Sequence, residues 1–117
     1  MRTLFLLLTI LCTTAVFGQY KNVSITEYIN SPLKRTILVD VRTAEEFAAG
    51  HLPNAINIDV KRDDFESKFA KIRKRKRIAV YCRSGKRSAM AAEKLDVLGY
   101  VKITNLTGGY LEYSEKK

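Results

Sequence analysis

One cysteine stands at the head of a short basic loop and is the strongest candidate for chemistry in this sequence. Cys82 follows an apolar run and opens the segment CRSGKRS, which ends at Ser88 and carries three cationic side chains. Cations and helix N-termini lower cysteine pKa values to about 3.5–7.5, which makes the thiolate the main form at neutral pH. Gly85 permits a turn that brings successive backbone N–H groups round to one point. The segment therefore predicts an anion-binding loop with a reactive thiolate; an inert cysteine beside a solvated basic turn is the alternative.

The elements that must position this loop alternate along the chain as short β-branched runs and helical patterns. Strands are predicted at 23–25, 37–41, 55–58, 78–81 and 101–106, and helices at 26–29, 43–50, 63–72 and 88–98, with a short helical tail after Gly109. Strands separated by helices imply parallel pairing through right-handed crossovers. We therefore expect an α/β fold: a small three-layer domain with a doubly wound, mostly parallel sheet of four or five strands. Ligands of such sheets bind beyond the carboxyl ends of the strands, where Cys82 falls.

Capping residues support two of these helices. Thr26 is predicted to cap the first short helix, because a threonine hydroxyl can accept a hydrogen bond from a first-turn N–H group. Thr43 and Glu46 have the spacing of a capping box, and Gly50 supplies the stop of the same helix. These local patterns place a well-defined helix directly after the strand predicted at 37–41.

The composition indicates a single domain and excludes several classes of protein. The chain has 117 residues, 46% of them hydrophobic, which is enough for one folded core and argues against disorder. Two cysteines and one histidine exclude a disulfide-rich scaffold and make a zinc site a poor hypothesis. We therefore expect no metal and no cofactor. The formal charge of +9 favours anionic partners without identifying one.

The first eighteen residues, MRTLFLLLTILCTTAVFG, have the layout of a secretory signal peptide. A single positive residue precedes an uncharged apolar run, and small residues come before Gln19. The uncharged stretch of 16 residues is short for a membrane span, which needs about 20. We expect residues 1–18 to be removed, leaving a domain at 19–117 in the periplasm or outside the cell. Cys82 would then be the single cysteine of the chain and could form no intramolecular disulfide.

Three motifs, in order along the chain, resemble the pattern of the rhodanese family. The segment CRSGKRSAMAA at 82–92 is similar to the family's active-site signature C-R-S-G-x-R-S-x-x-A-A. The segment DVRTAEEFAAGHLPNAIN at 40–57 resembles its upstream motif, and NLTGG at 105–109 resembles its closing motif. One departure is Tyr113, where many members have Trp, and this affects local packing more than chemistry. The resemblance covers essentially residues 23–113.

The resemblance implies a single-domain sulfurtransferase of the thiosulfate type. Cys82 would attack a sulfane sulfur of thiosulfate or a related persulfide donor, expel sulfite, and carry the sulfur as a persulfide to cyanide, a small thiol or a protein thiol. Backbone amides of the loop would stabilise the thiolate and the persulfide, and its cations would hold the anionic donor. The implied substrate-binding residues are Arg83, Ser84, Gly85, Lys86, Arg87 and Ser88. Ser88 would either hydrogen-bond the sulfur or cap the helix that follows.

Residues outside the loop are predicted to support the site rather than to catalyse. Asp40 and Arg42 end the neighbouring strand, and we expect them to orient or pair with the loop, because a stabilised thiolate needs no partner base. His51 is the single histidine and invites a Cys–His pair with Cys82. Its setting, Gly-His-Leu-Pro, is typical of a turn, so we expect His51 to have a structural role.

Two other functions compete with this hypothesis. A cysteine-dependent phosphatase or arsenate reductase uses a C-x5-R loop, which would place its arginine at position 88, whereas this sequence has Ser88 there and Arg87 one residue early. A loop shorter by one residue suits a sulfur atom better than a phosphate. A non-catalytic sulfur carrier or adaptor is the other alternative, although inert members of the family commonly lack the cysteine that Cys82 provides.

A run of basic residues at 71–77, KIRKRKR, suggests phosphate contacts with nucleic acid. Aromatic residues do not interleave with this run, so we expect no nucleic-acid partner and no stable membrane span. We expect instead a solvated linker that adds positive potential near the thiol and steers anionic donors toward it. An anionic membrane surface is a further partner that such a run can bind.

Overall fold

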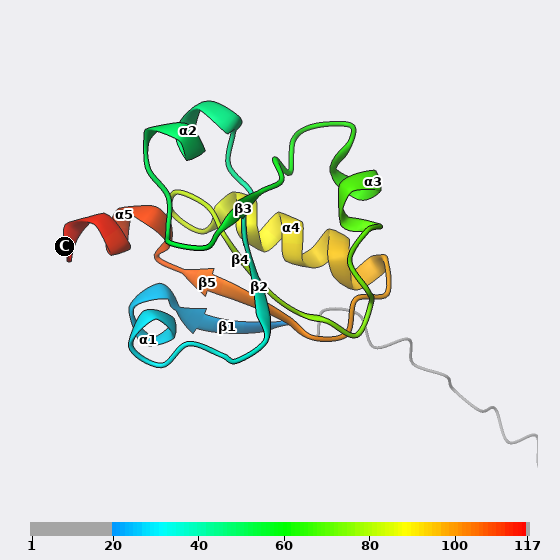
Figure 1. Ribbon diagram of the computed structural model, residues 1–117, viewed down its shortest axis with the longest axis horizontal. Coiled ribbons are helices and arrows are strands. Elements are labelled where there is room, and N and C mark those ends of the chain that lie inside the picture. Colours follow the sequence, from blue (N-terminus) through cyan, green and yellow to red (C-terminus); the bar gives the residue numbers. More distant parts are fainter. Residues whose placement is uncertain (1–19, 117) are drawn as a thin grey trace, which may run out of the picture.

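The computed structural model describes residues 20–116, which form a five-stranded parallel sheet (Figure 1). The strands are β1 (Lys21–Ser24), β2 (Thr36–Asp40), β3 (Ile56–Asn57), β4 (Arg77–Tyr81) and β5 (Ile103–Thr107). Their order across the sheet is β1-β5-β4-β2-β3, and every neighbouring pair is parallel. Because β4 is the central strand, its carboxyl end lies in the middle of one edge of the sheet.

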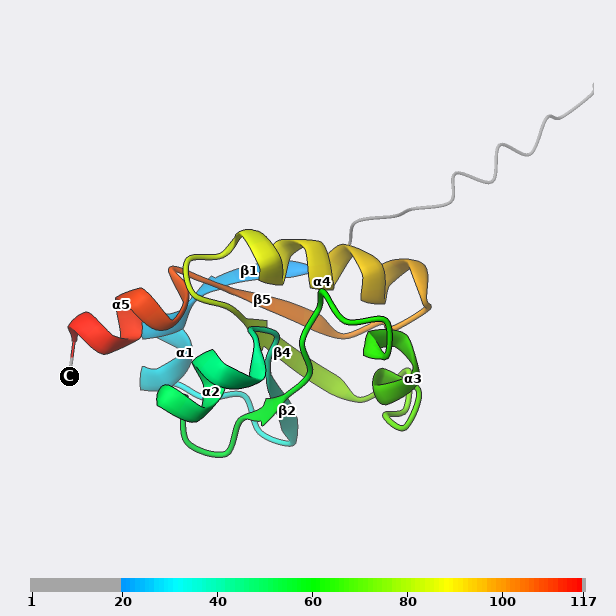
Figure 2. The same ribbon diagram turned by 90° about the horizontal axis from the view of Figure 1, so that it is seen from above.

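Helices cover both faces of this sheet. They are α1 (Ile25–Asn30), α2 (Ala44–Ala49), α3 (Phe65–Phe69), α4 (Lys86–Val97) and α5 (Gly109–Glu115). Side chains of α3 and α4 pack in one apolar core, and side chains of α1 and α5 pack in the other. Figure 2 shows α4 and α1 on opposite sides of β5. The predicted α/β fold with three layers and a doubly wound parallel sheet is confirmed, with five strands.

The central strand is apolar because both of its faces are covered. Ile78 and Val80 belong to the core under α3 and α4, and Cys82 continues this alternation just beyond the strand. Ala79 and Tyr81 point into the opposite core, which α1 and α5 close. A strand with two buried faces shows no polar alternation, as expected for a parallel sheet. The sulfur of Cys82 therefore starts from the α4 side of the sheet.

Three predicted helix boundaries differ from the structure. Ser24, and not Thr26, caps α1, since its hydroxyl accepts the Glu27 N–H group at 3.1 Å. The helix predicted at 63–72 is reduced to α3, and the Tyr100 hydroxyl donates to the carbonyl oxygen of Phe69 where this helix ends.

The helix predicted at 88–98 begins two residues earlier, at Lys86, with Gly85 as its N-cap residue. The capping box of α2 agrees with the sequence: Thr43 Oγ1 accepts the Glu46 N–H group at 3.2 Å, and Gly50 ends the helix. The predicted signal peptide at 1–18 lies outside the described residues. Among the helices that the structure describes, none is long and apolar enough to cross a membrane.

Candidate active site

The candidate nucleophile sits at the carboxyl end of the central strand, in a turn that leads directly into α4. Cys82 is 1% exposed, and its Sγ accepts a hydrogen bond from the Gly85 N–H group at 3.0 Å. Gly85 has a φ of +120°, a conformation that side-chain-bearing residues rarely adopt. This conformation turns the chain back over the sulfur and starts α4 at the same point. The N-terminus of a twelve-residue helix therefore lies beside the thiol.

Hydrogen bonds to the sulfur outweigh the effect of burial on its acidity. Burial raises the pKa of Cys82, because desolvation disfavours the thiolate. The Ser88 hydroxyl and three backbone N–H groups act in the opposite direction, and the net result is a pKa below the ordinary value of a thiol. The three N–H groups belong to Ser88, Gly85 and Ser84. The loop is thus an anion cradle built mainly from its own backbone.

Ser88 contacts the sulfur and does not cap the helix. Its Oγ lies 3.5 Å from Cys82 Sγ and donates to the carbonyl oxygen of Gly85 at 3.1 Å. Gly85 occupies the N-cap position, so Ser88 lies in the first turn of α4. Of the two roles that the sequence left open for Ser88, the geometry favours the hydrogen bond to sulfur.

The three cations of the loop have different surroundings. Arg87 forms a bidentate ion pair with Glu46 of α2, with Nη1–Oε1 and Nη2–Oε2 distances of 2.6 and 2.9 Å. This pair lowers the pKa of Glu46 to about 2, chiefly through the hydrogen bond from Arg87. The pKa of Arg87 is raised in turn, mainly by Glu46 and in smaller part by the charge of Cys82. Arg83 and Lys86 are exposed and form no ion pair within residues 20–116.

The residues at the end of β2 are buried and connect to the loop through α5. Arg42 Nη2 lies 2.7 Å from Asp40 Oδ2, and neither side chain is more than 4% exposed. The guanidinium group of Arg42 stacks 4.3 Å from the ring centroid of Tyr110. The Tyr110 N–H group donates to the Cys82 carbonyl oxygen at 2.8 Å, and the Leu111 N–H group donates to the Arg83 carbonyl oxygen at 3.0 Å. Asp40 and Arg42 therefore brace the segment that holds the loop.

The sequence did not assign three residues that the structure brings to the loop: Glu46, Gly109 and Tyr110. The sequence predicts Glu46 as a capping residue, but a local pattern does not show that the same carboxylate binds Arg87. Gly109 has a φ of +61°, and a Cβ atom there would lie 2.5 Å from the Arg83 carbonyl oxygen and 2.6 Å from that of Cys82. In the sequence, the two adjacent glycines of NLTGG are the signal that indicates such a close approach of the backbone.

His51 is engaged away from the sulfur. Its Nδ1 lies 2.8 Å from the Phe47 carbonyl oxygen, and its ring stacks on that of Phe47 with centroids 3.7 Å apart. This placement agrees with a structural role. In the described part of the chain, no cluster of three or more His, Cys, Asp or Glu residues could hold a metal ion.

The basic run is not near the thiol, and the expectation that it adds positive potential there is wrong. Residues 71–77 link α3 to the start of β4, whereas Cys82 follows the end of that strand. Five residues of extended chain separate Arg77 from Cys82 by about 16 Å. In a parallel sheet the two lie at opposite edges, so the run is a linker, as expected, but on the wrong side of the sheet for steering.

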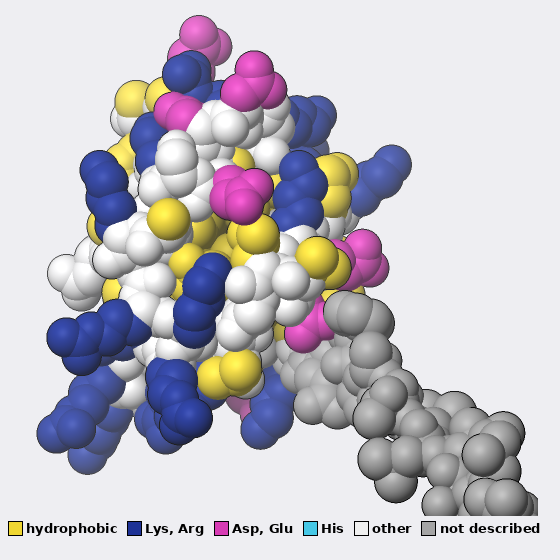
Figure 3. All heavy atoms as spheres, turned by 90° about the vertical axis from the view of Figure 1, so that its right-hand side faces the viewer, with side chains coloured by type: hydrophobic (Ala, Val, Ile, Leu, Met, Phe, Trp, Pro, Cys, Tyr) yellow, Lys and Arg dark blue, Asp and Glu magenta, His cyan; other side chains and the backbone are white. Residues whose placement is uncertain are grey.

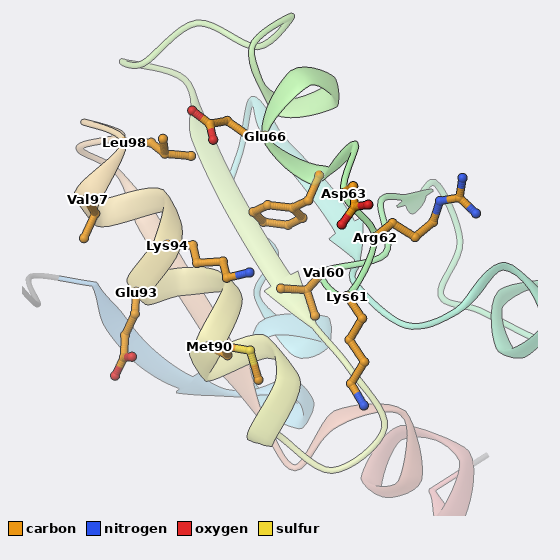
Figure 4. A pocket seen from close by; sticks show the side chains of 11 residues that line it. Val60, Lys61, Arg62, Asp63, Glu66, Met90, Glu93, Lys94, Val97 and Leu98 are labelled. Atoms are coloured by element: carbon orange, nitrogen blue, oxygen red, sulfur yellow. The ribbon is translucent and has the colours of Figure 1, made fainter.

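A groove of about 860 Å³ lies between α4 and the segment that leads into α3 (Figure 4). Val60, Phe65 and Met90 contribute its apolar surface, and charged side chains of both signs surround them. Cys82 is not among the lining residues, so this groove is separate from the candidate active site.

Comparison with known proteins agrees with this fold. A family model described as "Rhodanese-like domain" matches residues 25–116. The structure of a rhodanese-related protein from Thermoplasma volcanium superposes with a TM-score of 0.71 at 30% identity, over 83% of this chain and 93% of that one. The human single domain sulfurtransferase TSTD1 superposes with a TM-score of 0.66 at 31% identity, over 86% of this chain and 99% of that one.

A curated relative points in the same direction. A mitochondrial protein of Schizosaccharomyces pombe, named as a candidate thiosulfate sulfurtransferase, is 39% identical over 94 residues, which is 71% of this chain. The chain spans 66% of the length of that relative and 49% and 20% of two others. The chain belongs to the family of rhodanese-like domains, a family that includes sulfurtransferases.

Proposed function

We propose that this protein is a sulfurtransferase that carries a sulfane sulfur as a persulfide on Cys82. The observation that supports this most directly is the hydrogen-bonded cradle of the sulfur: the Gly85 N–H group at 3.0 Å and the Ser88 hydroxyl at 3.5 Å. These groups favour negative charge at the position of the sulfur, which is the charge that a nucleophilic thiolate and a persulfide both carry. A buried structural cysteine has no need of such donors.

In the first step, the Cys82 thiolate attacks the outer sulfur of thiosulfate or of a related persulfide donor. A sulfur–sulfur bond forms to Cys82 as the donor's own sulfur–sulfur bond breaks, and with thiosulfate the electron pair leaves on sulfite. The charge then rests on the terminal sulfur of the cysteine persulfide. Arg83 and Lys86 are the exposed cations that meet the dianionic donor. Arg87 acts through its pair with Glu46, which holds its guanidinium group beside the loop.

In the second step, a nucleophilic acceptor attacks the terminal sulfur of the persulfide and releases the Cys82 thiolate. Cyanide gives thiocyanate, and a small thiol or a protein thiol gives a new persulfide. Two successive displacements predict ping-pong kinetics. No cofactor enters either step.

Mass spectrometry of the intact protein before and after thiosulfate addition tests this proposal. We expect a gain of one sulfur atom that cyanide removes, with release of thiocyanate, and neither event in Cys82→Ser. Full thiocyanate formation by Cys82→Ser would overturn the role of the cysteine. A sulfur adduct that no acceptor removes would indicate a carrier or adaptor, and phosphoester hydrolysis without an adduct would indicate a phosphatase.

We also propose export, with removal of residues 1–18. The basis is the charge and hydrophobicity pattern of that segment. The mass of the protein recovered from the cells that make it tests this directly. A chain that begins at Gln19 is the expected result, and a chain that retains residues 1–18 would contradict it.

A further inference from the structure

We propose that the edge of the sheet opposite the thiol is a binding surface for anionic phospholipid membranes. The segments that precede β1, β2, β4 and β5 all end at this edge, because the strands are parallel. We call the cations that they contribute the basic edge: Lys21, Lys34, Arg35, the six Lys and Arg residues of 71–77, and Lys102.

The basic edge is one continuous surface. Arg77 Nη1 donates to the Lys34 carbonyl oxygen at 3.4 Å. The Val101 N–H group donates to the Lys74 carbonyl oxygen at 3.1 Å. These bonds join the loops that precede β2, β4 and β5. The segments 31–36, 70–77 and 98–102 contain no Asp or Glu that would neutralise their charge. Figure 3 looks onto this side of the molecule and shows Lys and Arg side chains gathered on it.

Apolar side chains are exposed among these cations. Leu33 is 44% exposed and Val101 is 65% exposed. Both line a hollow of about 500 Å³ whose wall also contains Lys21, Arg77 and Lys102. Cations that bind phosphate groups, next to aliphatic side chains that enter the outer acyl region, are the two components of an interfacial membrane site.

Two observations favour a bilayer over a nucleic acid. First, Leu33 and Val101 are aliphatic, whereas binding of single-stranded nucleic acid relies on aromatic stacking. Second, β1 begins at Lys21, so the uncharged apolar sequence of residues 3–18 joins the domain at this edge. Before residues 1–18 are removed, the chain would therefore bring the basic edge close to any membrane that this sequence enters.

The proposed orientation leaves the chemistry accessible. The length of β4 separates the basic edge from Cys82 by about 16 Å. When the basic edge contacts the membrane, the loop at residues 82–88 lies on the opposite side of the domain and faces the solvent. Membrane binding and sulfur transfer are therefore compatible, and neither requires the other.

Co-sedimentation of the full chain with lipid vesicles tests the proposal. One set of vesicles contains phosphatidylcholine alone, and the other contains phosphatidylcholine with phosphatidylglycerol. The test variant is Arg73→Gln/Arg75→Gln/Lys102→Gln, and the charge-matched control is Lys61→Gln/Lys68→Gln/Lys116→Gln, whose positions lie outside the basic edge. All chains share one N-terminal sequence, so its contribution cancels in the comparison.

We expect phosphatidylglycerol to strengthen binding, high salt to weaken it, and the test variant to lose roughly a hundredfold in partition coefficient, given the attraction of each cation to an anionic surface. The control variant should keep most of the affinity, and both should keep the activity of the parent chain. Leu33→Ser/Val101→Ser should weaken the binding that remains at high salt. Equal losses in the test and control variants would overturn the proposal, as would tighter binding to an oligonucleotide duplex than to the anionic vesicles.

Discussion

At the scale of single residues, the chemistry depends on which groups form hydrogen bonds with the sulfur atom of Cys82. Ser88 donates to the Gly85 carbonyl oxygen while its Oγ lies within reach of Cys82 Sγ. The thiol can donate to Ser88, and the thiolate can accept from it when the hydroxyl rotates. One side chain therefore serves both protonation states of Cys82.

Replacing Ser88 by Ala should raise the pKa of Cys82, because it removes a hydroxyl that favours the thiolate, and a hydrogen bond to a charged group contributes about 1.5 kcal/mol or more. The thiolate fraction at neutral pH would fall several-fold, and the pH profile of thiol alkylation would move to higher pH. The measurement is the rate of alkylation by iodoacetamide as a function of pH.

Ser84→Ala is the matched control, because Ser84 acts on the sulfur through its backbone N–H group, which alanine retains. Its profile should coincide with that of the parent protein. If both variants shifted the profile equally, the hydroxyl of Ser88 would have no special role.

At the scale of elements, the loop after β4 is held from two sides, by α2 and by the start of α5. The α2 contact is the ion pair between Glu46 and Arg87, and the α5 contact is backbone to backbone at Cys82 and Arg83. Neither contact is local in sequence. The geometry at the sulfur is therefore a property of three elements together.

Gly109→Ala should disrupt the loop, because the added Cβ would meet two carbonyl oxygens at 2.5 and 2.6 Å. We expect a loss of about 2–4 kcal/mol in the free energy of unfolding and a large loss of sulfurtransferase activity. Chemical denaturation and the rate of thiocyanate formation measure the two effects.

Gly99→Ala is the control for backbone strain alone, since Gly99 also has a positive φ, of +95°, but has no atom within 4 Å of an added Cβ. This variant should lose about 1 kcal/mol and keep its activity. Equal effects of the two substitutions would show that the close approach to the loop is unimportant.

The Glu46–Arg87 pair should make stability depend on acid. The folded state lowers the pKa of Glu46 from 4.5 to about 2, so its contribution is complete above the unfolded pKa and is lost as the pH falls from about 4.5 toward 2. Allowing for a carboxylate that is 30% exposed, Glu46→Gln should remove roughly 1–2 kcal/mol of stability at neutral pH and little at pH 2.

Urea unfolding of parent and variant across this pH range measures the effect. Glu45→Gln is the control, because Glu45 lies in the same first turn of α2 but is exposed and forms no ion pair among the described residues. A similar loss in Glu45→Gln would show that the first-turn position in the helix matters and the pair does not.

Hydrophobic patterns were sufficient to predict the strands, the parallel sheet and the placement of Cys82 at its carboxyl edge. Those features depend on local alternation and on a general rule of connection. The end of α3 depends on Tyr100, and the pairing of Arg87 depends on Glu46; both partners are distant in sequence. Periodicity and spacing carry no information about such contacts, and so the sequence could not show them.

At the scale of the whole molecule, positive charge is divided between two opposite edges of the sheet. The run 71–77 lies at the edge where β4 begins, and Arg83, Lys86 and Arg87 lie where it ends. The two groups of cations are close in the sequence, which is why the sequence predicts one positive region. The length of β4 separates them in the fold. The two groups of cations should have separable effects.

Lys86→Gln should lower kcat/KM for thiosulfate several-fold at low salt and flatten its dependence on ionic strength. Lys74→Gln/Lys76→Gln should leave both unchanged, because its charges lie beyond the Debye length of about 10 Å at 0.1 M salt. Steady-state rates across a salt series measure the difference. A fall in kcat/KM for the double variant would show that the basic run does steer the donor over a long range.

The contact between the start of α5 and the loop also determines when Cys82 becomes reactive during synthesis and folding. Gly109, Tyr110 and Leu111 leave the ribosome after Cys82, and until they dock, the carbonyl groups of Cys82 and Arg83 lack their hydrogen-bond donors. We expect a nascent chain, or one in transit through a membrane, to carry an ordinary and poorly nucleophilic thiol. Sulfur loading would then begin only when the fold is finished, which spares Cys82 from side reactions on the way.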